Sequence, residues 1–384
     1  MKTLLVTSDF PPIVGGISTV FHNVWKYLPA DDFIVLAPQA AGSIAWDKTF
    51  RGNVYRRYVP AGDNIFNKLI KALLLLLYCL GIIRKEKIEY LICGQPIIPG
   101  IAGVFLKKVY GIPFQVWVYG GEVVKFKHEK IIFRILLKVL REANTVVVNS
   151  EFTKSVYVKL GVPPEKIIKI TPAVDTDYFN SGIDTAKLRR QYNLANKRVL
   201  LTVARLSERK GHDAVIRVLS KIKDAFSGLV YLIVGTGPDE KGLRRLAKEL
   251  GVSDRVIFCG AVPDNELPQY YNLCDIHVMP NRQAKGVDTL EGFGISFIEA
   301  SACAKPVIGG KSGGSCEAVH DRATGFLVDP LNAEELADKI IILLTDKETA
   351  RKMGEEGRKR AVEHFHWKER AAILKQFFYN SPIK

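Results

Sequence analysis

Residues 199–211 read VLLTVARLSERKG, an apolar run followed by a polar loop that carries basic side chains. The run Val199–Val203 is short and apolar and contains β-branched residues, so it predicts a buried strand. Similar runs alternate with helical patterns on both sides of it, which is typical of α/β folds with parallel sheets. The runs expected to form strands are Thr3–Thr7, Phe33–Leu36, Tyr90–Ile92, Phe114–Val118, Thr145–Val148, Ile167–Ile170, Val199–Val203, Val230–Val234, Val256–Cys259, Ile276–Met279, Pro306–Gly309 and Gly325–Leu327.

A polar, turn-rich passage at residues 175–191 interrupts this alternation, which then starts again. The chain of 384 residues is also too long for one ordinary domain and suits two. We therefore expect two doubly wound Rossmann-like domains, residues 1–180 and 181–365, that face each other across a ligand-binding cleft. Residues 366–384 predict a C-terminal helix, which we expect to pack back on the first domain.

The composition is that of a soluble globular protein, with 47% hydrophobic and 25% charged residues. The six cysteines are scattered and form no C-x-x-C pair, so we expect neither a zinc site nor a disulfide framework. Free thiols suit a reducing cytosol, and the N-terminus MKTLLVTSDFPP lacks the apolar core and cleavage site of a signal peptide. These features predict a cytoplasmic protein.

The formal net charge of +15 indicates an anionic partner. Nucleic acid, an anionic membrane surface and phosphorylated substrates all meet that condition. Basic and aromatic residues do not interleave and no nucleic-acid module is recognisable, which argues against nucleic acid as a partner. A non-enzymatic nucleic-acid binder stays as an alternative reading of the charge alone.

The strongest apolar run is Ala72–Ile83, which lies between Lys71 and Arg84. Spanning a bilayer takes about 20 apolar residues, and this run is well short of that length. Basic residues gather around it and around later apolar stretches of the first half, a pattern that suits the headgroup region of an anionic bilayer. We therefore expect peripheral association with the inner face of the plasma membrane. A buried leucine-rich helix with solvated lysines is the alternative.

Two glutamates begin and end the block EGFGISFIE, residues 291–299. Gly292 and Gly294 predict a loop that lets the backbone approach a ligand closely. Ile295–Cys303 predicts a short helix whose first amides can face hydroxyl or phosphate oxygens. Glu299, in the first turns of that helix, could accept hydrogen bonds from two neighbouring hydroxyls, as on a ribose. A plain loop and helix with two solvated glutamates is the alternative.

Arg205 and Lys210 follow the strand Val199–Val203, at the edge where parallel α/β sheets bind ligands. The Arg205 guanidinium can bind two phosphate oxygens, and Lys210 adds a compact positive charge. Together they would hold a diphosphate and stabilise it as it leaves. A basic surface loop is the alternative.

A glycine-rich turn, FPPIVGGIS at residues 10–18, lies between the first strand and a helix. Backbone amides at such a helix start suit an anion, which draws attention to Gly15 and Gly16. The turn matches neither the dinucleotide pattern G-x-G-x-x-G nor a P-loop.

Two other motifs resemble ligand sites without the right context. Val234–Pro238 starts like a dinucleotide fingerprint, but Pro238 and the missing third glycine favour a plain turn between a strand and a helix. Asp175-Thr-Asp177 resembles a metal-binding D-x-D motif, yet aspartates at turn positions need no ligand. We expect no metal.

These motifs, in this order and spacing, resemble the retaining glycosyltransferases of the two-domain GT-B architecture, specifically family 4. The resemblance runs nearly the full length and rests on PPIVGG, AVDTDYF, VARLSERKG, LIVGTGPDEKGLRRLA, VIFCGAVPDNEL, the E-x7-E block, KSGGSCEAV, TGFLVDP and the final FHW. The segment MPNRQAKGVDTLEGFGISFIEA is most similar to mannosyltransferases that act on phosphatidylinositol mannosides.

The resemblance implies the transfer of a hexose, with mannose preferred, from GDP-mannose or another nucleoside-diphosphate hexose. The acceptor would be a hydroxyl of a glycan or of a lipid-linked molecule, the anomeric configuration would be retained, and no metal or other cofactor would be required. A sugar-nucleotide epimerase or hydrolase on the same architecture is the competing enzyme class.

The resemblance also implies roles for individual residues. The catalytic candidates are Arg205 and Lys210, which would hold the diphosphate, and Glu291, which would bind hydroxyls of the transferred sugar. Glu299 would bind the ribose. The other donor-binding candidates act through the backbone, and they are Gly15 and Gly16 on the phosphates, Gly292, Phe293, Gly294, Ile295 and Ser296 around the sugar, and Gly260 and Val262 against the base.

One position departs from the family pattern. Relatives usually carry His-Gly-x-Glu after the fourth strand, with the histidine approaching the transferred sugar, and here the stretch is Tyr119-Gly-Gly-Glu122. A tyrosine can donate a hydrogen bond but is not a cation near neutral pH. The histidine's role is therefore not carried over, and Tyr119 and Glu122 are kept as acceptor-side candidates.

Overall fold

The computed structural model describes residues 1–60, 65–283 and 291–380. Packing divides the chain into two compact units. The first consists of Met1–Pro172 together with Trp367–Lys384, and the second of Ala173–His366.

The first unit is built on a seven-stranded sheet in the order β3-β2-β1-β4-β5-β6-β7, with all neighbouring strands parallel. Strands β1, β4, β5 and β6 are buried along their whole length, as parallel strands are when helices cover both faces of a sheet. The strands are β1 (Thr3–Val6), β2 (Phe33–Pro38), β3 (Val54–Arg57), β4 (Tyr90–Cys93), β5 (Phe114–Val118), β6 (Thr145–Val148) and β7 (Ile167–Lys169).

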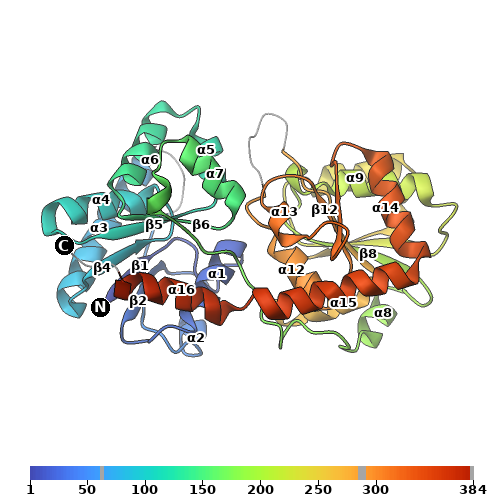
Figure 1. Cartoon of the computed structure of the whole chain (residues 1–384), viewed down its shortest axis with the longest axis horizontal. Helices are drawn as coiled ribbons and strands as arrows, with labels where there is room; N and C mark the ends of the chain where they lie inside the picture. Colours follow the sequence, from blue (N-terminus) through green and yellow to red (C-terminus); the bar gives the residue numbers. More distant parts are fainter. Residues whose placement is uncertain (61–64, 284–290, 381–384) are drawn as a thin grey trace. The chain divides into compact units, whose positions relative to one another are not determined.

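Helices α3 (Ile65–Glu86), α4 (Ile98–Tyr110) and α6 (Lys130–Glu142) pack side by side and share a hydrophobic core with the sheet. Helix α1 (Gly16–Trp25) packs instead against α16 (Trp367–Asn380), the red helix at the end of the chain in Figure 1. The last helix is thus an integral part of the first unit. The remaining helices are α2 (Ser43–Asp47), α5 (Gly121–Phe126), α7 (Glu151–Lys159) and η1 (Pro164–Lys166).

The second unit repeats this architecture around a six-stranded parallel sheet in the order β10-β9-β8-β11-β12-β13. The predicted α/β class with two Rossmann-like sheets is therefore confirmed. The strands are β8 (Arg198–Val203), β9 (Leu229–Val234), β10 (Val256–Gly260), β11 (Ile276–Met279), β12 (Val307–Gly310) and β13 (Gly325–Val328).

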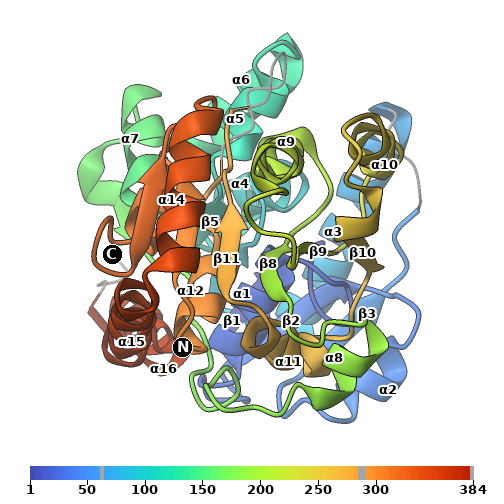
Figure 2. The ribbon, with the colours of Figure 1, turned by 90° about the vertical axis from the view of Figure 1, so that its right-hand side faces the viewer.

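Helices α9 (His212–Ile222), α10 (Glu240–Glu249) and α14 (Ala333–Thr345) form the main core of this unit with the sheet. Helix α12 (Ile295–Ala302) packs against both α11 (Leu267–Leu273) and α15 (Lys347–His364). In Figure 2, α9 and α10 lie above β8 and β9, and α11 lies below them. The remaining helices are α8 (Ala186–Gln191), α13 (Ser315–Ala318), η2 (Glu208–Lys210), η3 (Ser253–Arg255) and η4 (Asp264–Glu266).

The predicted strands omitted β3, whose sequence is VYRR. This strand lies at the edge of its sheet and none of its residues is buried, so it needs no apolar run. The apolar run Ala72–Ile83 lies within α3, and no helix in the described part of the chain is both long and apolar enough to cross a membrane.

The order of the strands fixes where a ligand can bind. In the second sheet the connections run in opposite directions on the two sides of the neighbouring strands β8 and β11. Open parallel sheets bind ligands beyond the carboxyl ends of the strands at such a switch point. In this unit that edge carries residues 204–211, after β8, and the loop that begins at Pro280, after β11.

Candidate functional site

Loops after β8, β11 and β12 approach one another at the carboxyl edge of the second sheet. Gly211, at the end of the first loop, has a φ of 75°, and a Cβ atom added to it would lie 2.2 Å from the Pro280 carbonyl oxygen. A side chain at this position would clash with the backbone of the second loop. Glycine therefore lets the first two loops touch.

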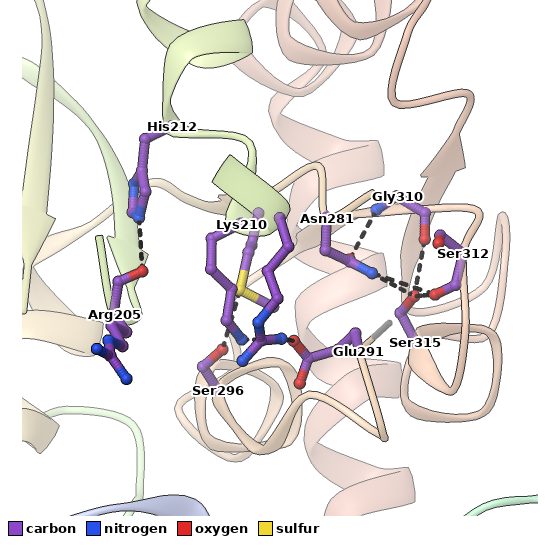
Figure 3. A network of polar contacts seen from close by, with 11 residues as sticks. Arg205, Lys210, His212, Asn281, Glu291, Ser296, Gly310, Ser312 and Ser315 are labelled. Carbon is purple, nitrogen blue, oxygen red and sulfur yellow. Dashed lines mark hydrogen bonds and ion pairs between the residues drawn. The ribbon is translucent and has the colours of Figure 1, made fainter. Parts of the chain in front are cut away.

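The carboxylate of Glu291 lies at this edge and contacts two cations (Figure 3). Lys210 Nζ lies 2.5 Å from Glu291 Oε2, and Arg209 Nη1 lies 2.6 Å from the same oxygen. The Glu291 side chain is only 11% exposed. Burial by itself would raise the pKa of Glu291, but Lys210 and Arg209 outweigh burial and lower that pKa. Glu291 is therefore an anion near neutral pH and not a proton donor.

The two oxygens of Glu291 differ. Oε2 accepts from both cations, whereas Oε1 has no hydrogen-bond partner in the part of the chain that the structure describes. Burial lowers the pKa of Lys210, and its contact with Glu291 partly offsets that effect. One oxygen of the carboxylate is thus engaged by the protein, and the other is available to a ligand hydroxyl.

A glycine-rich turn at residues 311–314 holds the backbone next to Glu291. The Gly314 N–H donates to the Glu291 carbonyl oxygen at 2.8 Å. A Cβ atom on Gly313 would lie 2.3 Å from that oxygen, and one on Gly314 would lie 2.0 Å from the Gly292 carbonyl oxygen. The two segments pack backbone against backbone, which fixes the position from which the Glu291 side chain extends.

Asn281, which is 1% exposed, supports this turn (Figure 3). Its Nδ2 donates to the Ser312 carbonyl oxygen and to Ser315 Oγ, each at 3.1 Å, and its Oδ1 accepts from the Gly310 N–H at 3.2 Å. Both ends of the buried amide are therefore paired, and the loop after β11 is joined to the loop after β12.

Arg205 presents its carbonyl oxygen to His212, and its guanidinium points away from that ring (Figure 3). The separation between the Arg205 carbonyl oxygen and His212 Nε2 is 3.3 Å. Burial lowers the pKa of His212 to about 4, so the ring is neutral and supports the loop. The Arg205 side chain is exposed and forms no ion pair with any residue that the structure describes. It is therefore available to an anion.

Glu299 in α12 accepts a hydrogen bond from the Tyr271 hydroxyl at 2.6 Å. Burial raises the pKa of Glu299 to about 7, the hydrogen bond from Tyr271 opposes this rise, and Asp264 adds to it. Glu299 therefore titrates near neutral pH, whereas Glu291 is ionised there. The two glutamates of the E-x7-E block differ in charge behaviour because their neighbours differ.

The segment between these glutamates turns sharply into α12. Gly294 has a φ of 90°, and a Cβ atom added to it would lie 2.6 Å from the Phe297 ring. Phe293 is buried, and the first amides of α12 have no partner within the helix. The other candidates in this segment, Gly292, Ile295 and Ser296, are half-buried.

The candidates for contact with the base lie at the end of β10. The Gly260 carbonyl oxygen accepts from the Gly235 N–H at 2.8 Å, and Val262 is half-buried. A Cβ atom on Gly235 would lie 2.1 Å from the Ala204 carbonyl oxygen. The VGTGP motif is therefore the predicted turn between a strand and a helix, and its glycine allows close packing on the loop after β8.

In the first unit, Gly15 and Gly16 lie at the exposed start of α1. The Arg56 side chain donates to the Pro11 carbonyl oxygen and forms an ion pair with Asp47 at 2.7 Å. The beginning of the PPIVGG loop is thus tied to β3, while its two glycines stay exposed. Their contact with donor phosphates stays a prediction.

Tyr119 and Glu122 have partners within the first unit. The Tyr119 N–H lies 3.1 and 3.2 Å from the two Glu122 oxygens, and the Tyr157 hydroxyl donates to Oε2 at 3.1 Å. Burial raises the pKa of Glu122, and these hydrogen bonds partly offset the rise. The Tyr119 hydroxyl donates to the Gly94 carbonyl oxygen at 3.3 Å. Their acceptor-side role stays a prediction.

The D-x-D motif forms a turn, in which Asp175 Oδ1 accepts from the Tyr178 N–H at 3.1 Å. Among the described residues, no group of three or more His, Cys, Asp or Glu side chains is arranged to hold a metal ion. Residues 284–290, which belong to the segment quoted for the resemblance and precede Glu291, lie outside the described residues.

Three residues of the site were not predicted from the sequence: Arg209, Tyr271 and Asn281. Arg209 adjoins Lys210 in the quoted loop, so a second cation was visible there. Asn281 lies in the segment quoted for the resemblance and Tyr271 lies outside it, but the partners of both are distant along the chain and only the fold brings them together.

Comparison with known proteins identifies the family. The description "Glycosyltransferase Family 4" matches residues 14–178, and "Glycosyl transferases group 1" matches residues 184–360. A GDP-mannose-dependent alpha-(1-6)-phosphatidylinositol monomannoside mannosyltransferase of Mycolicibacterium smegmatis is 30% identical to this chain over 97% of the chain and 96% of the relative. The chain belongs to glycosyltransferase family 4.

Other comparisons agree with this assignment. The enzyme of the same description from Mycobacterium tuberculosis is 32% identical to this glycosyltransferase over 98% of this chain and 97% of its own. The crystal structure of Anabaena HepE with UDP and glucose has a TM-score of 0.84 at 20% identity, covering 99% of this chain and 100% of that one. Sucrose-phosphate synthase from Thermosynechococcus elongatus has a TM-score of 0.81 at 22% identity, covering 99% and 98%. At these identities the two structures support the fold alone, and the predicted GT-B fold is confirmed.

Replacing Gly314 with alanine will displace the segment that carries Glu291, because the new methyl group would lie 2.0 Å from the Gly292 carbonyl oxygen. A displacement of about 1 Å in an active site costs about 100-fold in rate. We expect glycosyl transfer by Gly314→Ala to fall by about that factor, with an unchanged circular dichroism spectrum. Gly242→Ala is the matched control, because no neighbouring atom lies within 4 Å of its added Cβ. Full activity of Gly314→Ala would contradict the importance of this contact.

The raised pKa of Glu299 predicts a pH-dependent stability. This pKa is about 7 in the folded protein, above the value of about 4.3 for an unperturbed glutamate. Between these values the folded state binds more protons than the unfolded state, so folding gains stability as the pH falls. We expect the melting temperature of the wild type, relative to that of Glu299→Gln, to rise between about pH 7.5 and about pH 5.5. A constant difference would show that Glu299 is not perturbed in this way.

Proposed function

We propose that this glycosyltransferase transfers mannose from GDP-mannose to a hydroxyl of a lipid-linked acceptor, with retention of the anomeric configuration. The observation that carries the proposal is the Glu291 carboxylate, which is largely buried and ionised, with one oxygen on Lys210 and Arg209 and the other without a partner among the described residues. A carboxylate of this kind can accept hydrogen bonds from the hydroxyls of a neutral sugar. The mycobacterial relatives, described as acting on phosphatidylinositol monomannoside with GDP-mannose, support the choice of donor and acceptor.

The remaining donor contacts follow from the same edge of the second sheet. Arg205 has an exposed guanidinium, and Lys210 carries a positive charge on a flexible stem, so both can bind the diphosphate. Glu299 would accept hydrogen bonds from the ribose hydroxyls, and its ionised form offers both oxygens as acceptors. The backbone of Gly292–Ser296 would line the sugar, and that of Gly260–Val262 would lie against the base.

In the proposed reaction the bond between the sugar C1 and the diphosphate oxygen breaks, and a bond forms between C1 and the acceptor oxygen. The acceptor proton passes to the leaving phosphate on the same face of the sugar, so the protein need not supply a general base. Arg205 and Lys210 offset the charge that develops on the diphosphate, which is a large contribution in transferases of this kind. The lowered pKa of Glu291 fits a binding role and not that of a proton donor.

The first unit offers a surface for a lipid-linked acceptor. The adjacent helices α3, α4 and α6 expose apolar side chains, namely Leu73, Leu77, Phe105, Val109 and Ile131. Exposed basic side chains lie on the same helices, among them Lys85, Lys108 and Lys130. Apolar and basic groups on neighbouring helices suit the headgroup region of an anionic bilayer, so we propose that this surface binds the membrane peripherally.

Replacing Arg205 with alanine will lower the turnover number for transfer from GDP-mannose by roughly 100- to 1,000-fold, as for other lost transition-state donors. Lys210→Ala should do the same, and Lys221→Ala, at an exposed position of α9, is the control. The assay compares GDP-mannose with UDP-glucose, with and without a phosphatidylinositol mannoside acceptor. A full-rate Arg205→Ala enzyme would contradict the assignment, and equal donor breakdown without acceptor would favour a hydrolase or epimerase.

Flotation with liposomes tests the membrane surface. We expect the protein to float with vesicles that contain anionic phosphatidylglycerol and not with phosphatidylcholine alone, and added salt should weaken the association because it screens charge. The double change Leu73→Ser and Leu77→Ser should reduce flotation, whereas Ile373→Ser, at another exposed apolar position, should not. Absence of salt-sensitive binding would indicate a soluble acceptor.

A further inference from the structure

Arg209 belongs to the charged cluster of the second unit, yet the proposed donor contacts do not use it. Its Nη1 lies 2.6 Å from Glu291 Oε2, the oxygen that Lys210 Nζ approaches to 2.5 Å. One carboxylate oxygen therefore serves two cations, which leaves a positive charge in excess. When an anionic donor enters the site, one of the two cations can move from Glu291 to the donor. The other cation then stays paired with the glutamate.

The two cations are suited to different tasks. Lys210 has a compact ammonium on a flexible stem and can turn from a carboxylate to a phosphate, whereas the planar guanidinium of Arg209 fixes the direction of its hydrogen bonds. If Lys210 moves to the diphosphate, Arg209 becomes the partner that keeps Glu291 paired. A buried carboxylate left without a partner would lose its orientation or take up a proton.

The backbone of Arg209 is held independently of its side chain. Its carbonyl oxygen accepts from the Arg282 N–H at 2.9 Å, and the Arg282 guanidinium lies 2.8 and 2.9 Å from the two oxygens of Asp213. Gly211 packs on the Pro280 carbonyl oxygen next to this contact. A change confined to the Arg209 side chain should therefore leave the loop, and with it Lys210, in place.

We propose that Arg209 is a positioning residue that holds Glu291 through Oε2 while Oε1 binds the hexose, and so sets the affinity for the sugar part of the donor. This inference rests on the proposed function, because it takes Lys210 to bind the diphosphate and Glu291 to bind the hexose. Arg209 would act through Glu291 and would not contact the nucleotide.

Calorimetric binding of GDP and of GDP-mannose separates this role from direct phosphate binding. We expect Arg209→Ala to bind GDP-mannose roughly 10- to 100-fold more weakly than the wild type, the effect of one lost charged hydrogen bond, and to lose clearly less affinity for GDP, which has no hexose for Glu291 to bind. Arg209→Lys keeps a cation and should recover part of the loss. Arg245→Ala, at an exposed position of α10 in the same unit, is the matched control.

The GDP binding that Arg209→Ala retains also shows that the nucleotide site is folded. Equal losses for GDP and GDP-mannose would overturn the proposal, because they would place Arg209 on the phosphates. Undiminished binding of GDP-mannose would overturn it as well. In a Glu291→Gln background, Arg209→Ala should cause less than about a twofold further loss, since coupled residues do not act additively.

The pH profile supplies a readout that a merely structural role would not change. Arg209 is one of the two cations that lower the pKa of Glu291, so its removal raises that pKa. Because Glu299 titrates near pH 7 and would hide this change, the profile is measured in a Glu299→Gln background, where the acid limb of kcat/KM for transfer should move to higher pH in Arg209→Ala and stay in place in Arg209→Lys. An acid limb at the same pH in Arg209→Ala would count against the proposal.

Failure of the proposed function and failure of this inference give different results. If the wild type binds UDP and UDP-glucose but neither GDP nor GDP-mannose, the proposed donor is wrong and the same comparison is made with the UDP pair. If the wild type binds a donor but Arg209→Ala loses no more affinity for the sugar-bearing ligand than for the nucleotide, the donor assignment stands. The positioning role of Arg209 is then wrong.

Discussion

Contact between backbone and backbone is the constraint on which the candidate site depends. Glycines let the loops after β8, β11 and β12 approach one another closely. At Gly211 and Gly314, a carbonyl oxygen of a neighbouring segment lies so near that a Cβ atom would clash with it. Even Gly310, inside β12, leaves no room for a Cβ beside the Asn281 backbone. Because these contacts involve atoms that cannot rotate away, the charged side chains on the loops start from fixed points. Precise placement of a few groups is what transition-state stabilisation requires.

Electrostatic differences within one short segment then give its two glutamates different ionisation behaviour. Glu291 and Glu299 belong to the same nine-residue block, yet two cations keep the first ionised, whereas burial beside a tyrosine brings the pKa of the second to about 7. His212 is kept neutral by burial, so it adds no positive charge to that of Arg205, Arg209 and Lys210. Identical side chains thus acquire different properties from their neighbours, not from their spacing in the sequence.

This distinction explains how much could be predicted. Strands such as Phe114–Val118 and Thr145–Val148 were predicted with their observed bounds, because a buried parallel strand must be apolar and short. The edge strand β3 carries Arg56 and Arg57 and could not be recognised by that rule. At the site, Lys210 and Glu291 stand out as charges beside glycines, and Arg205 stands out as a cation just after a predicted strand. The pairing of Glu291 with Arg209, the hydrogen bond from Tyr271 to Glu299 and the support from Asn281 depend on long-range contacts that no local pattern encodes.

The first unit is formed by two separate segments of the chain, and this has a consequence for synthesis on the ribosome. Helix α16 supplies Trp367, Ala371 and Leu374 to the interior of a unit whose other residues end at Pro172. That unit cannot be complete until the last part of the chain has emerged, whereas the second unit is continuous and can fold as soon as His366 is available. Domains generally fold in the order in which they are synthesised. Here the unit that is begun first is finished last, so its partly folded form must remain soluble while the second unit is made.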